Sequence, residues 1–500
     1  MSLAYISTRA QIGIDAPAVG VEVHISNGLP AFTVVGLPET AVREARDRVR
    51  SAILNSGFEF PARRITVNLA PADLPKEGGR YDLAIALGIL SASQQVNPDK
   101  LGEYDCYGEL ALDGSLRHVN GLLPALINGQ QRDRYSLIPR ANLAEAQLMH
   151  PDTTRLAGSL AQVCASLNGG DPLDSPEAGR LAFDPPAELD LSEVRAQYQA
   201  KRALEIAAAG GHHMVMMGPP GTGKSMLAQR LGSILPMLSD DEAMQTACIR
   251  SLGQQAVNLQ NWRQRPFRAP HHTVSYVALV GGGRHPRPGE ISLAHNGILF
   301  LDELTEFNRH TLEALREPLE TGSIHIARAA GQAIYPARFQ LIAAMNPCPG
   351  GCDSIQSCDC SPEQLRRYRG KLSAPLLDRI DIRIQLARLP SRDLVSAQSG
   401  ETTSAEVLER VKAARIHQRQ RQSCINSELS AKALEHYCNL NRDCRRLIQK
   451  SIDKLGLSAR SYHKLLRLAR SIADLELTDS IEHDHLAEAI ALQACQRLTN

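Results

Sequence analysis

Residues 218–225 read Gly-Pro-Pro-Gly-Thr-Gly-Lys-Ser and directly follow the apolar run Met-Val-Met-Met at 214–217. The next residues, 226–231, have the apolar spacing of a helix. A strand that runs into a glycine-rich loop and then into a helix is the context of a phosphate-binding P-loop. A glycine-rich turn without a ligand is the alternative, but the fixed positions and both flanks agree with a P-loop. The stretch therefore predicts a bound nucleoside triphosphate.

The residue types in this loop explain how it holds phosphate. Its glycines let the backbone turn so that N–H groups surround the phosphates, and the following helix presents its positive N-terminus to them. Lys224 neutralises the β- and γ-phosphates, and the Ser225 hydroxyl takes one position on Mg²⁺. The predicted ATP-binding residues are Gly218, Pro219, Pro220, Gly221, Thr222, Gly223, Lys224, Ser225 and Met226.

Residues 298–303, Ile-Leu-Phe-Leu-Asp-Glu, supply the second half of an ATPase site. Four apolar residues predict a buried strand, whose end delivers Asp302 to the Mg²⁺ shell and Glu303 to the attacking water. An Asp-Glu pair after an apolar strand is common by itself, but at this distance behind a P-loop it indicates ATP hydrolysis. Asn346 ends the apolar run 341–345 and resembles the sensor asparagine that orients the same water in AAA+ ATPases.

Composition indicates a globular protein of several domains. The 500 residues correspond to roughly three domains, and 43% are hydrophobic and 22% charged. No apolar run approaches the roughly 18 residues of a membrane span, and the N-terminus lacks a basic segment followed by an apolar one. We expect a cytoplasmic protein with no membrane partner. The net charge of +1 means that any DNA binding must be local.

The pattern along the chain predicts two α/β domains and a helical one. Residues 1–170 alternate short strand-like runs with helical patterns, and 171–189 are rich in proline, glycine and acid, which is typical of a linker. The ATPase motifs lie within 190–390. From 391 to 500 the pattern is helical, as expected for a small lid domain.

Two stretches of the first domain, 74–87 and 108–122, resemble the domain shared by the Lon protease and the RadA recombination ATPase. The positions of the Lon serine and lysine are Arg80 and Leu123 here, so the resemblance implies a scaffold without the proteolytic dyad. A basic group in this domain is a candidate for DNA contact, with a solvated basic face as the alternative. Its members are Arg63, Arg64, Lys76 and Arg80.

Two insertions interrupt the ATPase motifs, at 267–290 and 322–338, and the second has the alternation and central glycine of a β-hairpin. In the helix-2-insert branch of AAA+ proteins, insertions at these places point into the pore of a ring. Their basic residues are then candidates for phosphate contacts along a translocating strand, and ordinary surface loops are the alternative. These residues are Arg284, Arg287, Arg328 and Arg338.

Four of the eleven cysteines lie between positions 348 and 360, and the others are scattered, which is not the layout of a disulfide framework. Cys348 and Cys352 have a plausible zinc spacing, whereas Cys358 and Cys360 are close for two ligands of one tetrahedral site. Structural Zn²⁺ and free or redox-labile thiols therefore both stay open.

Two arginines are candidates to complete the ATPase site. Arg379, in Leu-Leu-Asp-Arg-Ile-Asp at 376–381, falls where related ring ATPases carry the arginine finger that reaches a neighbouring subunit's γ-phosphate. An ion pair with Asp378 or Asp381 is its alternative. Arg460 follows a predicted helix N-cap, where AAA+ proteins keep a sensor arginine, and its alternative is an ordinary surface arginine.

Three residues near the loop have weaker signals. Gln197 lies where related ATPases place an adenine-contacting segment, although the usual glycine before it is Ala196 here. His212 and His213 precede the P-loop strand, and turn histidines are the interpretation favoured over metal ligands.

Several longer motifs together resemble the magnesium-chelatase-like bacterial ATPases called YifB or ComM, over nearly the whole chain. The motifs are Arg-Ala-Pro-His-His-Thr at 268–273 and the stretches 288–304, 315–320 and 344–349. The cysteine loop departs from the family, whose members usually read Cys-Pro-Cys-Gly where this chain reads Cys-Pro-Gly-Gly-Cys. The implied fold is an α/β AAA+ P-loop ATPase core with a C-terminal helical lid, preceded by the Lon-protease-like α/β domain.

The implied activity is a homo-hexameric ring that hydrolyses ATP with Mg²⁺. The resemblance implies a DNA helicase that drives branch migration on single-stranded and branched DNA. Such a motor helps to integrate incoming DNA during natural transformation and homologous recombination. The alternatives are a magnesium-chelatase motor subunit, against which the Lon-like domain argues, and a MoxR-like chaperone that remodels proteins.

Overall fold

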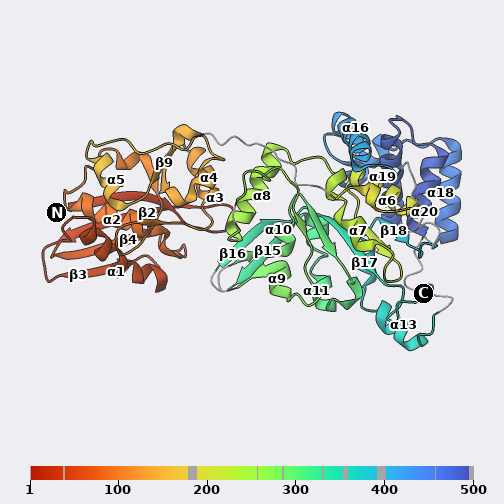
Figure 1. The fold of residues 1–500 in the computed structure, drawn as a ribbon, viewed down its shortest axis with the longest axis horizontal. Helices are drawn as coiled ribbons and strands as arrows, with labels where there is room; N and C mark the ends of the chain where they lie inside the picture. The colour runs from red at the N-terminus through yellow and green to blue at the C-terminus, as the bar shows by residue number, and fades with distance from the viewer. Residues whose placement is uncertain are drawn as a thin grey trace.

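The computed structural model has two large sheets and a group of helices arranged along one long axis (Figure 1). We find no helix among the described residues with the length and hydropathy needed to cross a lipid bilayer. The structure describes residues 2–37, 40–177, 189–255, 257–283, 286–328, 331–352, 358–390, 401–455 and 458–494. Within the predicted linker 171–189, residues 178–188 lie outside these ranges.

The N-terminal part is built on a seven-stranded mixed sheet with the order β3-β4-β2-β1-β5-β8-β9. Helix α2 (Asp82–Ala92) is buried along its whole length, because ten of its eleven residues are small, aliphatic or serine, and it packs on β1 and β2. Helix α1 (Thr40–Asn55) packs on α2. The strands are β1 (Ser2–Arg9), β2 (Ala18–Ser26), β3 (Ala31–Val35), β4 (Arg64–Ala70), β5 (Tyr104–Cys106), β8 (Tyr135–Pro139) and β9 (Thr154–Ala157).

Two of the predicted DNA-contacting cations in this part are interior residues. Lys76 is fully buried and donates to the Pro71 carbonyl. Arg80 is 4% exposed, and its Nη2 lies 2.7 Å from Gln11 Oε1 and donates to the Asn120 carbonyl as well. Both the DNA interpretation and the solvated-face interpretation are therefore wrong for this pair. Arg63 and Arg64 are exposed.

The second sheet has five parallel strands in the order β11-β14-β17-β10-β18. Its three central strands are fully buried and mostly apolar, because parallel strands inside a sheet are covered on both faces. The P-loop strand β10 (Met214–Met217) lies between β17 (Gln340–Met345) and β18 (Ile382–Gln385). The remaining two strands are β14 (Ile298–Leu301) and β11 (Phe267–Arg268), so the predicted first insertion begins with a strand of the main sheet.

The two insertions pack on each other. The predicted hairpin is confirmed: β15 (Ser323–Arg328) pairs antiparallel with β16 (Gly331–Pro336). The other insertion forms α9 (Tyr276–Val280), β12 (Gly281–Gly282), β13 (Arg287–Pro288) and α10 (Glu290–Leu293). Ile324 and Ile326 of the hairpin share a hydrophobic cluster with Leu279 and Ile291, so the two insertions form one unit.

Helix α8 (Asp240–Leu252) joins the N-terminal part to the second sheet. Its Ala247 and Cys248 lie in one buried cluster with Tyr107 and Leu126 of the N-terminal part. Its start is fixed by a capping box, in which Ser239 accepts from the Glu242 amide and Glu242 accepts from the Ser239 amide. The N-terminal part is therefore docked through apolar contact.

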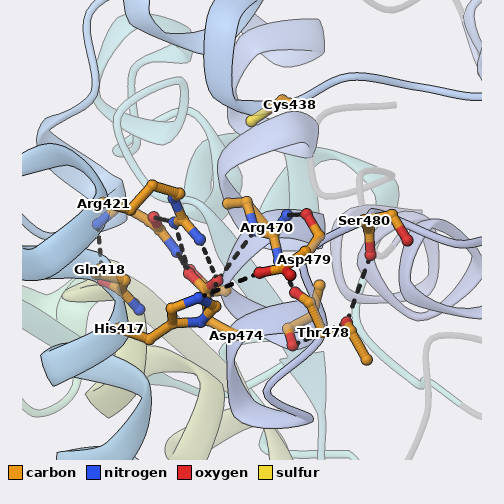
Figure 2. Close-up of polar contacts among 12 residues, drawn as sticks. His417, Gln418, Arg421, Cys438, Arg470, Asp474, Thr478, Asp479 and Ser480 are labelled. Carbon is orange, nitrogen blue, oxygen red and sulfur yellow. Dashed lines mark hydrogen bonds and ion pairs between the residues drawn. The ribbon is translucent and has the colours of Figure 1, made fainter.

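The C-terminal part is helical, as predicted. It contains α16 (Ser404–Gln422), α17 (Ala431–Tyr437), α18 (Arg442–Leu455), α19 (Ala459–Leu475) and α20 (His483–Ala494). Its interior holds a buried ionic cluster, in which Arg421 and Arg470 converge on Asp474 (Figure 2). Arg421 Nη1 lies 2.6 Å and Arg470 Nε 3.0 Å from Asp474 Oδ1. The cluster ties α16 to α19.

Asp474→Ala leaves both guanidinium groups without their shared anion, and removal of one partner from a buried ion pair costs about 3–5 kcal/mol. We expect the free energy of local opening of α16 and α19, measured by hydrogen exchange, to fall by about that amount. Asp484→Ala on α20 is the matched control, because the Asp484 side chain is 100% exposed. Equal exchange in the two variants would contradict a structural role for the cluster.

Candidate functional site

The predicted P-loop follows β10 and surrounds the side-chain amino group of Lys224. Gly221 (φ 79°) and Gly223 (φ 87°) adopt left-handed backbone that side chains other than glycine rarely tolerate. Lys224 begins α7 (Lys224–Gln229), and its Nζ lies 2.6 Å from the Gly218 carbonyl oxygen and 2.9 Å from that of Pro219. The loop therefore encloses a cation next to a helix N-terminus.

The carboxyl ends of β10, β14 and β17 bring the other predicted residues to this loop. The Ser225 Oγ donates to Asp302 Oδ2 over 2.7 Å, and Asn346 Oδ1 accepts from Lys224 Nζ over 3.2 Å. Burial lowers the pKa of Lys224, while Asp302 and Glu303 raise it. On balance the pKa of Lys224 lies below its ordinary value, because the effect of burial is larger than that of the two carboxylates.

Glu303 stands at the mouth of the site. Its backbone is left-handed at φ 51°, and its amide donates to Asp302 Oδ1 over 2.9 Å. Its Oε2 lies 3.2 Å from Nδ1 of His272, and the Glu303 side chain is 55% exposed. His272 is a residue that the sequence interpretation missed, although it belongs to the motif at 268–273. Only the fold brings it beside Glu303.

Gln197 also contacts the loop. Its Nε2 lies 3.3 Å from the Thr222 carbonyl oxygen and 3.1 Å from the Ala387 carbonyl oxygen, which follows β18. Gln197 and Ala196 both have left-handed backbone, and they precede α6 (Tyr198–Gly210). The position expected near an adenine therefore borders the P-loop.

These residues fit ATP and Mg²⁺ by their chemistry. The hydroxyl of Ser225 and the carboxylate of Asp302 are hard oxygen donors of the kind that Mg²⁺ prefers. The Lys224 amine and the loop N–H groups are matched to phosphate oxygens.

Arg379 and Arg460 lie together, and a third residue holds them. Both guanidinium groups pair with Glu320, Arg460 Nη2 at 3.1 Å from Glu320 Oε1 and Arg379 at Oε2. The Arg379 guanidinium, through its hydrogen bond and its charge, and then Arg460 lower the pKa of Glu320. Glu320, which sequence interpretation did not single out, takes the place of the Asp378 and Asp381 partners considered there.

The arginine pair lines a cavity of about 1080 Å³ at the amino ends of the strands. His213, just before β10, and Gln340, the first residue of β17, line the same cavity. The P-loop lies at the opposite, carboxyl end of β10. In this chain, Arg379 and Arg460 therefore face away from the loop of their own subunit.

Of the two histidines before β10, His212 is buried and His213 is partly buried. His212 contacts Asp381 Oδ2 at 3.3 Å through Nδ1 and Ser471 Oγ of α19 at 2.8 Å through Nε2. His213 Nδ1 accepts from the Leu341 amide over 3.1 Å, and burial lowers the pKa of His213 to about 4. These are not solvated turn residues, because they join the sheet to its neighbours and to the lid.

Of the four predicted DNA-contacting arginines of the insertions, the side chains of Arg287 and Arg338 are described, and they lie at different places. Arg287 is exposed, and its Nη1 lies 3.3 Å from Gln254 Oε1. Arg338 lies at the base of the hairpin and lines the cavity of Arg379 and Arg460. Arg284 and the side chain of Arg328 lie outside the described residues.

The four cysteines of residues 348–360 lie close together in space. The sulfur atoms of Cys348, Cys352, Cys358 and Cys360 all lie within 4.8 Å of one another, so the short Cys-x-Cys spacing does not keep the second pair apart from the first. The intervening residues 353–357 lie outside the described ones.

Three family models match the chain. The model described as magnesium chelatase, subunit ChlI, covers residues 190–394, which hold the P-loop and Asp302. The model of subunit ChlI of Mg-chelatase covers 21–142, and that of the subunit ChlI C-terminal part covers 401–493.

Individual relatives extend over the full chain. The uncharacterised protein YifB of Salmonella typhimurium is 51% identical over 498 residues, which cover 100% of this chain and 98% of YifB. Competence protein ComM of Haemophilus influenzae is 50% identical over 502 residues, covering 100% and 99%. The DNA replication licensing factor Mcm6 of Anopheles gambiae is 27% identical over 215 residues, 41% of this chain and 25% of Mcm6.

Glu303→Gln keeps the shape of the side chain and removes its basicity. Loss of a general base typically costs 10²–10⁴-fold in rate. We expect ATP hydrolysis to fall by at least about a hundredfold, while the binding of a fluorescent ATP analogue stays within about threefold of wild type, because the P-loop is unchanged. Glu306→Gln is the matched control, since that carboxylate pairs with Lys371 at 3.6 Å instead. Undiminished hydrolysis in Glu303→Gln would refute the role of Glu303.

Proposed function

This chain belongs to the YifB/ComM family of magnesium-chelatase-like proteins, and from that premise we propose that it is an ATP-driven ring motor that promotes branch migration of DNA. The proposal joins three parts: hydrolysis of ATP, a site shared between subunits, and action on DNA. Integration of incoming DNA is the process in which such a motor acts. The 50% identity to competence protein ComM, over the full length of this chain, supports it.

Hydrolysis is supported by the residues gathered at the carboxyl ends of three strands. Lys224 and the loop amides bind the phosphates, while Ser225 and Asp302 hold Mg²⁺, which supplies charge neutralisation of the transferring phosphoryl group. Glu303 accepts a proton from the attacking water, and Asn346 orients that water. His272, 3.2 Å from Glu303 Oε2, orients the glutamate toward it.

The shared site is supported by one observation above all: Arg379 and Arg460 lie at the amino end of β10, whereas Lys224 lies beyond its carboxyl end. A cation that stabilises the developing charge on the γ-phosphate must touch it. Because these arginines face away from their own P-loop, we infer that they serve the nucleotide of a neighbouring subunit in a ring. Glu320 holds the pair until a phosphate competes for it.

Action on DNA is supported by the relatives and by the insertions. ComM is named a competence protein, and Mcm6, which is similar over 41% of this chain, is named a DNA replication licensing factor. The hairpin β15–β16 and the α9–α10 segment form one packed unit, with the Tyr335 hydroxyl donating to the Pro286 carbonyl over 2.6 Å. A packed unit of this kind can transmit a conformational change to a bound DNA strand. The exposed Arg287 belongs to this unit.

A chelatase motor is the second candidate, because all three family models carry the name of subunit ChlI. The model over residues 21–142 shows that the N-terminal part does not by itself separate the two functions. Stimulation by DNA separates them, because a porphyrin-metallating motor has no reason to respond to a DNA strand. The same measurement excludes a MoxR-like chaperone.

Mixing two inactive variants tests the shared site. Lys224→Ala lacks a P-loop lysine and Arg379→Ala lacks the finger, whose removal costs roughly a thousandfold or more in rate. If the arginine acts across the boundary, mixed rings contain some interfaces with both groups intact. We expect the mixture to hydrolyse ATP well above the sum of the separate variants, and Arg446→Ala, an exposed α18 control, to behave as wild type. A mixture equal to that sum would contradict the shared site.

DNA stimulation and strand exchange test the motor. We expect forked or three-stranded DNA to raise ATP hydrolysis severalfold and the protein to extend the exchanged region in an ATP-dependent way. Glu303→Gln, which retains the P-loop, is expected to bind the same junction without extending it. Hydrolysis that ignores DNA, or junction extension by Glu303→Gln, would contradict a DNA motor.

A further inference from the structure

We propose that Cys348, Cys352, Cys358 and Cys360 bind one Zn²⁺ ion, and that this site holds Asn346 and the P-loop in register. The metal site stands on the geometry of the cysteines alone. Its effect on the ATPase rests on the proposed function.

The sulfur atoms are already spaced for one ion. In a tetrahedral zinc site with Zn–S bonds of ~2.3 Å, the sulfurs lie about 3.8 Å apart. The four Sγ atoms lie within 4.8 Å of one another, so a shift of a few tenths of an ångström in each closes the site. Among the described residues, this is the one group of three or more cysteine, histidine or acidic side chains that converges in this way.

The backbone around the sulfurs is shaped to bring them together. A Cβ at Gly350 would lie 3.1 Å from Cys360 Sγ and 3.5 Å from Cys352 Sγ, so the sulfurs occupy the space of a side chain. The Cys352 amide donates to Cys348 Sγ over 3.2 Å, as expected of a ligand thiolate stabilised by its own loop. Cys360 directly precedes Ser361, the N-cap of α13 (Pro362–Arg369), whose positive end favours nearby thiolates.

The ligand set selects the ion. Four thiolates suit Zn²⁺ or iron and not the hard cations Mg²⁺ and Ca²⁺. We commit to zinc, because the sequence and the fold give a single four-cysteine set that satisfies a closed tetrahedral structural site. The other described cysteines are spread over the three parts of the chain, and most of them are buried in its apolar clusters.

The site lies directly behind the nucleotide pocket. Cys348 follows Asn346 by two positions, and Asn346 Oδ1 bonds Lys224 Nζ over 3.2 Å. Tyr368 of α13 donates to the Asn346 carbonyl over 3.3 Å. A Cβ at Gly351 would lie 3.2 Å from the ring of Pro220, so the cysteine loop rests on the P-loop itself. Zinc bound to Cys348 therefore holds the loop that directly follows Asn346, and Cys360 holds α13, whose Tyr368 bonds the Asn346 carbonyl.

Metal content tests the site without reference to catalysis. We expect elemental analysis of protein purified without chelator to give about one zinc per chain, and cobalt(II) exchanged into it to show the visible bands of a tetrahedral tetrathiolate. Cys352→Ser and Cys358→Ser should each weaken zinc binding by more than the roughly 10–100-fold seen when only an outer partner of a ligand is lost. Cys424→Ser in the lid should keep it. Iron in place of zinc, a disulfide within the set, or a full zinc content in both serine variants would overturn the proposal.

Catalysis tests the coupling separately. Removing zinc by a chelator is expected to lower kcat by up to about a hundredfold through misplacement of Asn346, while binding of a fluorescent ATP analogue holds. Adding zinc back restores kcat. Unchanged kcat in zinc-free protein would overturn the coupling and leave the metal site intact. A zinc-loaded protein that never hydrolyses ATP, with or without DNA, would instead refute the proposed function.

Discussion

The four residues of β10 impose the constraint on which the rest of the structure depends. In a parallel sheet the loops after the strands meet at one edge and those before them at the other. Lys224, Asp302 and Asn346 accordingly share the carboxyl edge, while Arg379 and Arg460 share the amino edge with Glu320. In the proposed mechanism, a second copy of the chain supplies Arg379 and Arg460 to the triphosphate held by Lys224. The proposed ring rests on this placement of charges at the two ends of one short strand.

Polar contacts join the lid to the ATPase part on the amino side of the sheet. His212 bridges Asp381 and Ser471, and Arg415 of α16 donates to the Ala208 carbonyl over 2.9 Å through Nε. Burial alone would raise the pKa of Asp381, but the hydrogen bond from His212 and the charge of Lys464 hold it well below its usual range. These contacts join the lid to the ATPase part of the same chain.

Local patterns in the sequence are sufficient to predict a site residue where it lies directly after an apolar strand. The P-loop, Asp302, Glu303 and Asn346 are predicted in this way, and the structure places them close together. Contacts between segments that are distant in the sequence cannot be predicted from local patterns. Glu320 pairs with both Arg379 and Arg460. His272 pairs with Glu303, and this contact too exists only because of the fold. Arg80 looked like a surface cation because a charged residue beside two glycines usually is one, yet it is sealed under its own domain. Spacing alone made the Cys-x-Cys pair look unsuited to a shared metal site, whereas the turn at Gly350 brings all four sulfurs together.

The most direct measurement is an electron cryo-microscopy structure of the protein with a non-hydrolysable ATP analogue and forked DNA. The account predicts a closed ring in which Arg379 and Arg460 have left Glu320 and contact the triphosphate held by Lys224 of the next subunit. A nucleotide-loaded particle with both arginines still on Glu320, and no neighbouring subunit across the nucleotide, would contradict it.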